Sequence, residues 1–166
     1  MIRLRPYKQI DADYIIKWID TEKDFTKWCA NNIKYPLKKE ALKELDDEFK
    51  NSQDTLLFTA LDETGAPVGF FAMKNINYSK NSVHIGYVII DKSRRNSGYG
   101  KQMMRQVMKY AFEILCLTRI TLRVFDNNEE AHRCYLSVGF TDENYDENNF
   151  KFKDEIWGCY LMSIEK

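Results

Sequence analysis

The sequence predicts an α/β fold in which a mixed, mostly antiparallel central sheet carries helices on both faces. Two β-prone runs, Thr55–Leu61 and Val68–Met73, flank a turn-forming cluster of Asp, Gly and Pro, as in a β-hairpin. The apolar side chains of Gly98–Leu115 keep to one helical stripe between two strand-like runs, Val83–Ile90 and Arg119–Phe125. Val83–Ile90 is apolar on both alternating faces, which predicts a central strand covered on each side. Because hairpins join antiparallel strands and helical crossovers join parallel ones, this order predicts a mixed sheet.

The N-terminal third is predicted to form one strand and two helices. Ile2 and Leu4 alternate with arginines, as in an edge strand. One helix begins at Asp11 and another follows Pro36. The apolar positions of the two helices are Tyr14, Ile15, Trp18 and Ile19, and then Leu42, Leu45 and Phe49. We assign no structure to the stretch between them.

The C-terminal part is predicted to hold a further helix and two strands. Either residue of the pair Asn127-Asn128 can cap the helix, which has glutamates in its first turn and ends at Gly139. Strands follow near Phe140–Asn144 and Ile156–Ile164. The acidic, asparagine-rich segment Asp142–Asn149 lies between or overlaps these two strands.

Composition limits the classes of protein to which the chain can belong. Its 166 residues, 44% of them hydrophobic, suffice for one domain spanning residues 1–166. The 25 basic residues balance 25 acidic ones, which argues against a nucleic-acid or membrane partner, and no apolar run approaches the roughly 20 residues that cross a bilayer. Four widely spaced cysteines and the lack of an export signal predict reduced thiols in a cytoplasmic protein. The oligomeric state stays open, a homodimer included.

A glycine-containing loop, Lys92–Lys101, joins a buried strand to the longest helix. Glycines let a backbone approach a ligand closely, a helix start offers unpaired N–H groups, and nearby cations add charge, so the loop predicts a site for phosphate or pyrophosphate. The P-loop pattern is absent, and Gly98-Tyr99-Gly100 lacks the third glycine of a dinucleotide fingerprint. The alternative is a solvated turn whose glycines merely start the helix.

Two blocks of the sequence carry a resemblance to a known family. Arg95–Gly100 matches the [Gln/Arg]-x-x-Gly-x-[Gly/Ala] signature of the GNAT superfamily of acyl-CoA-dependent N-acetyltransferases. Asn128, Ala131, Tyr135 and the Gly139-Phe140 pair are similar to a later block of the same family. The resemblance covers nearly the whole chain and is weakest from Asp20 to Phe49.

The resemblance implies acetyl-CoA as the acetyl donor, without a metal. It also implies that Tyr87–Ile90 splays away from Arg119–Val124 and leaves backbone groups free for the pantetheine arm. Lys92 is an alternative to Arg133 as a partner of the CoA phosphates. The residues implied to bind the donor are Val88, Ile90, Arg95, Asn96, Ser97, Gly98, Tyr99, Gly100, Lys101, Asn128 and Arg133.

Two side chains are candidates for proton transfer. An ammonium group with a pKa of about 10 must lose a proton before it attacks a thioester, and His84 is a candidate base, with a relaying water or a merely structural histidine as alternatives. Tyr135 matches the tyrosine that, in similar enzymes, protonates the departing CoA thiolate; its alternative is simple core packing. A backbone N–H near Val88 would stabilise the oxyanion. Cys134 lacks a histidine–carboxylate pair, so we expect direct transfer without an acyl-enzyme.

The acceptor amine is not named by the sequence. Small amines, polyamines, aminoglycosides, peptide N-termini and lysine side chains all stay open. Aromatic residues and an acidic stretch are candidates for the acceptor side, with core packing and a solvated loop as their alternatives: Trp18, Trp28, Tyr35, Asp142, Glu143, Asp146 and Glu147. Two other functions compete: an inactive acyl-CoA-binding regulatory module, and an RNA-binding domain using Arg94 and Arg95, which the neutral net charge disfavours.

Overall fold

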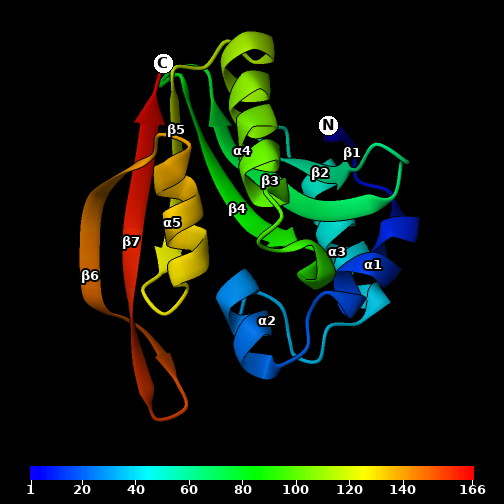
Figure 1. The fold of residues 1–166 in the computed structure, drawn as a ribbon, viewed down its shortest axis with the longest axis vertical. Coiled ribbons are helices and arrows are strands. Elements are labelled where there is room, and N and C mark those ends of the chain that lie inside the picture. The colour runs from blue at the N-terminus through cyan, green and yellow to red at the C-terminus, as the bar shows by residue number, and fades with distance from the viewer.

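The computed structural model describes residues 1–166 and contains one seven-stranded sheet with five helices (Figure 1). The strands follow the order β1-β2-β3-β4-β5-β7-β6, and only the β4–β5 pair is parallel. The predicted mixed, mostly antiparallel sheet is confirmed. In chain order the elements are β1 Arg3–Pro6, α1 Ala12–Lys17, α2 Glu22–Cys29, α3 Lys39–Lys50, β2 Leu56–Leu61, β3 Pro67–Asn77, β4 Ser82–Ile90, α4 Tyr99–Lys109, β5 Arg119–Phe125, α5 Glu129–Ser137, β6 Thr141–Phe152 and β7 Glu155–Glu165.

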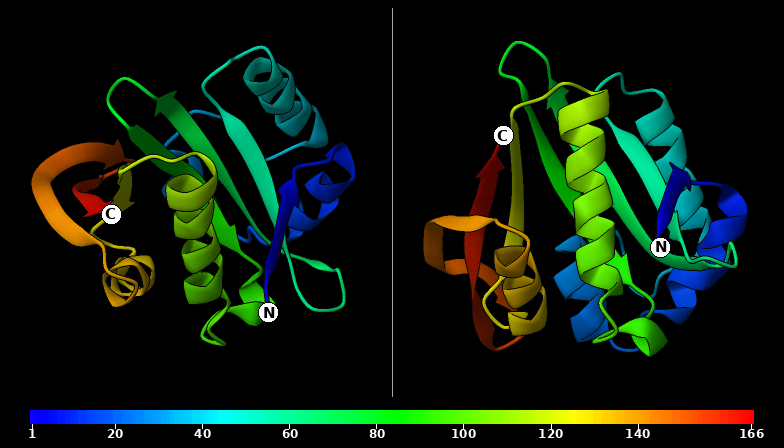
Figure 2. Two further views of the ribbon diagram at one scale, coloured as in Figure 1. Left: turned by 90° about the horizontal axis from the view of Figure 1, so that it is seen from above. Right: turned by 45° about the horizontal axis from the view of Figure 1, so that its top comes forward.

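Helices cover both faces of the sheet, as the sequence predicts. Helices α4 and α5 lie over one face, and α1 to α3 lie over the other (Figure 2). Each face has its own apolar core: Met103, Met104 and Val107 of α4 belong to the first, while Phe25 and Leu42 of α2 and α3 belong to the second. A π-helical turn, Tyr110–Ile114, extends α4 to nearly the predicted end of the helix. None of these helices is long and apolar enough to span a membrane.

Two glycines allow close contacts of α4 with the elements around it. A Cβ at Gly69 of β3 would lie 2.7 Å from Sδ of Met103, so α4 rests directly on the sheet there. A Cβ at Gly100 would lie 3.3 Å from Sγ of Cys134, so the first turn of α4 packs against α5. The start of α4 is therefore held against α5.

The parallel strands β4 and β5 pair over only half the length of β4. Ser82–Ile85 pairs with Arg119–Leu122, and the rest of β4 pairs only with β3. At the branch point, Tyr87 and Val88 together oppose one β3 residue, a β-bulge in which Tyr87 takes a left-handed φ of 51°. We call the open end of the β4–β5 pair, where the two strands separate after Ile85 and Leu122, the fork. It is the splay that the family resemblance implies.

The bulge exchanges the faces to which alternate residues of β4 point. Before it, Val83 and Ile85 pack into the core under α4; after it, Tyr87 and Ile89 pack into the opposite core under α1 to α3. Strand β4 is central and contributes to a core on each face, as predicted, but alternate residues are only half-buried, so the cover on each side is incomplete. The physical reason is that the helices on the second face do not extend over the first half of β4.

Two other segments differ from the prediction or refine it. Helix α2 occupies the stretch to which we assigned no structure; Oγ1 of Thr21 caps it by accepting a hydrogen bond from the N–H of Asp24 at 3.1 Å. The acidic segment predicted between or over the last two strands lies within β6. An edge strand tolerates its charged side chains because both of its faces meet water.

Candidate active site

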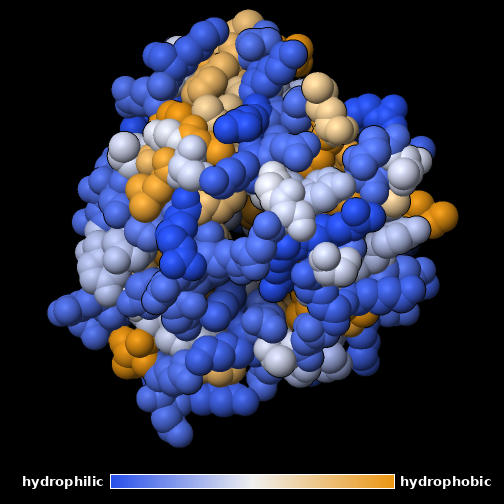
Figure 3. Space-filling model, in the orientation of Figure 1, coloured by the Kyte–Doolittle hydropathy of each residue, from blue (hydrophilic) through white to orange (hydrophobic).

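A cleft of about 860 Å³ lies between α2, the second half of β4 and the N-terminal ends of α4 and α5. Figure 3 shows a hollow near the centre of this side of the molecule. The floor of the cleft is apolar and includes Val88, Ile90 and Met104, whereas its rim carries charged side chains of both signs.

Most of the residues predicted to bind the donor line this cleft. They are Val88, Ile90, Arg95, Asn96, Gly98, Gly100, Lys101, Asn128 and Arg133, together with the candidate acid Tyr135. Ser97 and Tyr99 belong to the same loop and helix start but are not among the lining residues; the guanidinium carbon of Arg94 lies 5.6 Å from the ring centre of Tyr99. Lys92 forms an ion pair with Asp20 instead of lining the cleft.

The two helix ends present unpaired backbone donors beside these cations. The first hydrogen bonds inside the helices are donated by Gln102 to Gly98 at 3.0 Å and by His132 to Asn128 at 3.1 Å. The N–H groups of the residues between each pair have no partner in their own helix. Gly98 precedes α4 with a φ of 81°, a conformation that costs glycine little. Amide donors at helix ends together with cations suit phosphate groups.

Asn127 adds a polar side chain that sequence reasoning considered only as a helix cap. Both its amide oxygen and its amide nitrogen are buried in the cleft wall, and neither has a hydrogen-bond partner. The backbone carbonyl of Asn127 accepts a hydrogen bond from Nζ of Lys27 at 3.1 Å, which ties α2 to the start of α5. An unpaired buried amide is costly, and a bound molecule that carries amides of its own, as pantetheine does, can satisfy it.

Tyr135 lies at the buried end of the cleft. Its side chain is 6% exposed, and burial raises the pKa of its hydroxyl far above the ordinary value. The hydroxyl is therefore protonated at neutral pH and suited to donate a proton. Burial also raises the pKa of the neighbouring Cys134 thiol, although Lys101 opposes the shift. A protonated thiol is a poor nucleophile, in agreement with the expectation of direct transfer.

The structure does not bring His84 and Tyr135 together. His84 precedes the bulge at Tyr87, so it points to the sheet face opposite Val88 and Ile90, and its Nδ1 lies 2.9 Å from Oγ1 of Thr121. Burial, Lys74 and Arg123 lower the pKa of His84 to about 4. At neutral pH its imidazole is uncharged and only weakly basic.

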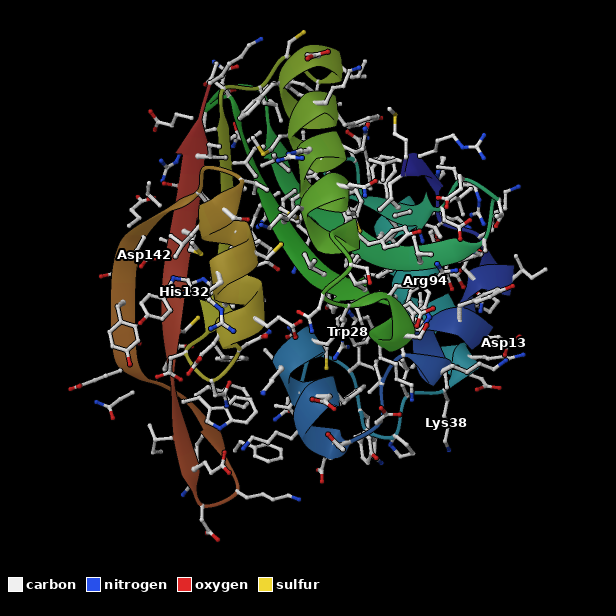
Figure 4. All side chains as sticks on the ribbon, in the orientation of Figure 1. Asp13, Trp28, Lys38, Arg94, His132 and Asp142 are labelled. Carbon is white, nitrogen blue, oxygen red and sulfur yellow. The ribbon has the colours of Figure 1, made fainter.

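Helix α2 brings aromatic side chains to the fork. Trp28 donates a hydrogen bond from Nε1 to the carbonyl of Tyr87 at 2.8 Å, and the two rings meet edge to face with centres 5.5 Å apart. Figure 4 shows Trp28 near the end of α2 that approaches β4. Trp18 and Trp28 line the cleft, whereas Tyr35 packs against Phe25. The motif that could have located α2 is its capping Thr21, followed by acidic residues in the first turn.

The acidic residues of β6 are not part of the cleft. Asp142 accepts a hydrogen bond from Nε2 of His132 at 2.8 Å, and Figure 4 shows the two side chains facing each other between β6 and α5. Glu143 pairs with Arg119. The carboxylates that do line the cleft are Asp24, Glu129 and Glu130.

The sequence of the chain matches a family of known enzymes over most of its length. A model of the acetyltransferase (GNAT) family matches residues 15–140. The chain belongs to this family. The resemblance to the GNAT superfamily is thereby confirmed.

Individual relatives show how far the similarity extends. An uncharacterised N-acetyltransferase of Bacillus subtilis is 36% identical over 46% of this chain and 41% of its own length. A spermidine N(1)-acetyltransferase of Vibrio cholerae is 26% identical over 63% of this chain and 60% of its own length. The aligned segments thus span less than two thirds of these relatives.

Solved structures extend the comparison to the fold. Spermidine N-acetyltransferase of Vibrio cholerae, solved with CoA and spermine, superposes with a TM-score of 0.85 at 21% identity, over 99% of this chain and 95% of that chain. A dodecameric structure of the Vibrio enzyme superposes with a TM-score of 0.77 at 22% identity, over 99% of this chain and 93% of that chain. The fold is shared throughout this chain.

Proposed function

We propose that this chain is an N-acetyltransferase that moves an acetyl group from acetyl-CoA to a primary amine by direct attack. The observation that carries the proposal is the cleft itself: it joins two helix N-termini to the open end of the β4–β5 pair in a member of the acetyltransferase family. The helix ends suit phosphates, and the fork offers strand backbone to an amide-containing arm.

Acetyl-CoA fits the residues that line the cleft. The amides of Tyr99, Gly100 and Lys101 would hold the pyrophosphate, with Arg95 and Arg133 as its cationic partners. Val88 and Ile90 would contact the pantetheine arm, and the unpaired amide of Asn127 would bond to one of its amides beside Asn128. This arrangement would place the thioester at the fork, close to Tyr135.

The chemistry requires a proton to leave the amine and another to reach the leaving group. The neutral amine forms a bond to the thioester carbonyl carbon, and a backbone N–H near Val88 stabilises the oxyanion. The carbon–sulfur bond then breaks, and Tyr135 gives its proton to the departing thiolate and regains one from solvent. The pKa of His84 is lowered to about 4, which makes its imidazole a weak base at neutral pH, so we favour water as the carrier of the amine proton.

The acceptor is proposed at the level of a primary amine. The Vibrio relative acts on spermidine, and a second Bacillus relative, 31% identical over 45% of this chain, is a probable spermine acetyltransferase, so polyamines belong in any acceptor panel. We also propose that residues 1–166 act as one domain and that the chain self-associates, as the dodecameric neighbour does. Light scattering after size exclusion tests the last point, and a monomeric mass would refute it.

Release of CoA thiol from acetyl-CoA tests the function. The assay compares polyamines, aminoglycosides, amino acids and short peptides with free N-termini against acetyl-CoA alone. We expect release above this blank for at least one class, with the acetylated amine detected by mass spectrometry. Tight binding of acetyl-CoA without turnover of any class would instead support the regulatory-module alternative.

A further inference from the structure

A second concave surface lies on the other face of the β4–β5 pair. It is a groove of about 570 Å³ over the first half of β4 and the adjoining parts of β3, β5 and β7. Thr121 and Arg123 of β5 and His84 of β4 line it, whereas Leu122, which lies between the two β5 residues, is buried in the core under α4. On this face α3 lies over the β2 side of the sheet (Figure 2), which leaves the groove open.

The groove is strongly basic in a chain with no net charge. Its cationic side chains are Lys74, Lys80, Arg119 and Arg123, and no Asp or Glu is among its lining residues. Arg119 is paired with Glu143 and, at 3.0 Å, with Glu165. Lys74, Lys80 and Arg123 take part in none of the ion pairs of the structure. Three uncompensated cations around one concave surface create a local positive potential.

The low pKa of His84 agrees with this potential. Burial is the largest cause of its fall to about 4, and the charges of Lys74 and Arg123 are the next causes. Two of the cations therefore lie close enough to the buried imidazole to oppose a further positive charge. A negative group is what the groove lacks.

The groove ends at the fork. Arg123 directly follows Leu122, the last β5 residue that pairs with β4. On β4 the corresponding position is Gly86. A Cβ added at Gly86 would lie 3.3 Å from Cδ of Lys74, so the Lys74 side chain passes close over this glycine. Nζ of Lys74 lies 5.2 Å from the ring centre of Tyr87, the bulge residue. A molecule in the groove can thus reach the open end of the β4–β5 pair from the face opposite the cleft.

We propose that this groove binds a carboxylate or phosphate group of the acceptor, so that the preferred acceptor is an amine carrying a nearby negative charge and not a polycation. The inference rests on the proposed acetyltransferase activity and specifies its substrate class. Lys74 and Arg123 hold the anionic group while the amine extends into the fork. A polyamine would instead place its positive charges beside unpaired cations, which disfavours it as a partner.

Acceptor preference under charge reversal tests the proposal. For the wild-type protein we expect a kcat/KM for a peptide with a free N-terminus and acidic residues at least about tenfold above that for spermidine. Lys74→Glu and Arg123→Glu should each lower the value for the acidic peptide by about tenfold and raise that for spermidine. The neutral variants Lys74→Gln and Arg123→Gln remove the positive charge without adding a negative one, so they disturb folding less. They should change both kcat/KM values in the same direction as the glutamate variants. Lys109→Glu, on α4 and outside the groove, should match the wild type.

A binding experiment separates this proposal from the proposed function. The probe is an N-acetylated Asp-Asp peptide, which has no amine to acetylate, and an N-acetylated phosphoserine peptide distinguishes phosphate from carboxylate. Calorimetric binding of either probe, lost in Lys74→Glu and Arg123→Glu, supports the groove even if no amine is acetylated. Acetylation of spermidine in preference to acidic amines, or no binding of either probe, would overturn the proposal while leaving acetyl transfer intact.

Discussion

The two faces of the β4–β5 pair present charge in different ways. On the α4 side, the cleft combines backbone amides at two helix ends with cations and the carboxylates Asp24, Glu129 and Glu130. On the other side, all the charged side chains that line the groove are cations. The positions of backbone donors are set by glycines and by where each helix begins, whereas charged side chains on an open strand face can be replaced without changing the fold. The comparison indicates how the two proposed sites differ: the proposed donor site depends on backbone conformation, whereas the proposed acceptor preference depends on a few exposed side chains.

Substitution of Tyr135 tests the chemical role of the cleft and has the largest expected effect. Tyr135→Phe keeps the buried ring but removes the proton donor, so kcat should fall by about 100-fold while the KM for acetyl-CoA stays within about twofold. Tyr78→Phe, at a tyrosine that is 63% exposed, is the matched control and should leave both constants unchanged. An unchanged kcat in Tyr135→Phe would assign Tyr135 to packing.

Substitution of Gly98 tests the anion site at the start of α4. Glutamate there would sit at a φ of 81° and place a carboxylate beside the bound phosphates, so we expect acetyl-CoA to bind about 100-fold more weakly by calorimetry. Gly65→Glu is the matched control, because Gly65 has a φ of 89° and equally open space in the β2–β3 turn. Equal affinity in the two variants would refute the pyrophosphate assignment.

The pH dependence of the unfolding free energy tests the lowered pKa of His84 on the groove side. Between the ordinary pKa of 6.5 and the folded value of about 4, the unfolded chain binds a proton at His84 that the folded chain does not. Folding stability therefore falls as pH falls through this window, by about 3 kcal/mol, and is retained above it. His84→Asn should flatten the dependence by this amount in urea denaturation at pH 7 and pH 4. A variant with the wild-type slope would show that His84 keeps its ordinary pKa.

The smallest expected effect concerns the support of the fork by α2. Trp28→Phe preserves an aromatic ring but leaves the buried carbonyl of Tyr87 without its donor, which should cost about 1–2 kcal/mol of unfolding free energy. Trp157→Phe removes a comparable bond to Glu155, a carboxylate that water can reach, and should cost less. If the two variants lose equal stability in chemical denaturation, the fork does not depend on this bond in particular.

The parts of the site that depend on local sequence could be predicted. Arg95–Gly100 and the block from Asn128 to Phe140 carry spacings tied to a backbone conformation. The structure brings part of each block to one cleft: Arg95, Asn96, Gly98 and Gly100 from the first, and Asn128, Ala131 and Tyr135 from the second. Their individual roles stay predictions. The hairpin, the long helix and the strand Arg119–Phe125 likewise follow from periodicity, which needs only neighbouring residues.

The parts that the sequence could not predict depend on long-range geometry. Simple alternation would put His84 on the same strand face as Val88 and Ile90, but the bulge at Tyr87 places them on opposite faces. The sequence has no glycine or asparagine at position 87 that would indicate a left-handed φ there. The groove draws Lys74, His84 and Arg123 from three strands that only the sheet brings together. The alternation of Arg119, Thr121 and Arg123 with apolar residues was a usable sign that this face of β5 is open.

Two-substrate kinetics tests most directly the claim that donor and acceptor meet at the fork from opposite faces. Initial rates would be measured with acetyl-CoA and the best acceptor varied together. Simultaneous occupation of cleft and groove predicts intersecting double-reciprocal lines and no acetylated protein after incubation with acetyl-CoA alone. Parallel lines together with an acetylated Cys134 would show that the two substrates use one site in turn, and would contradict the account.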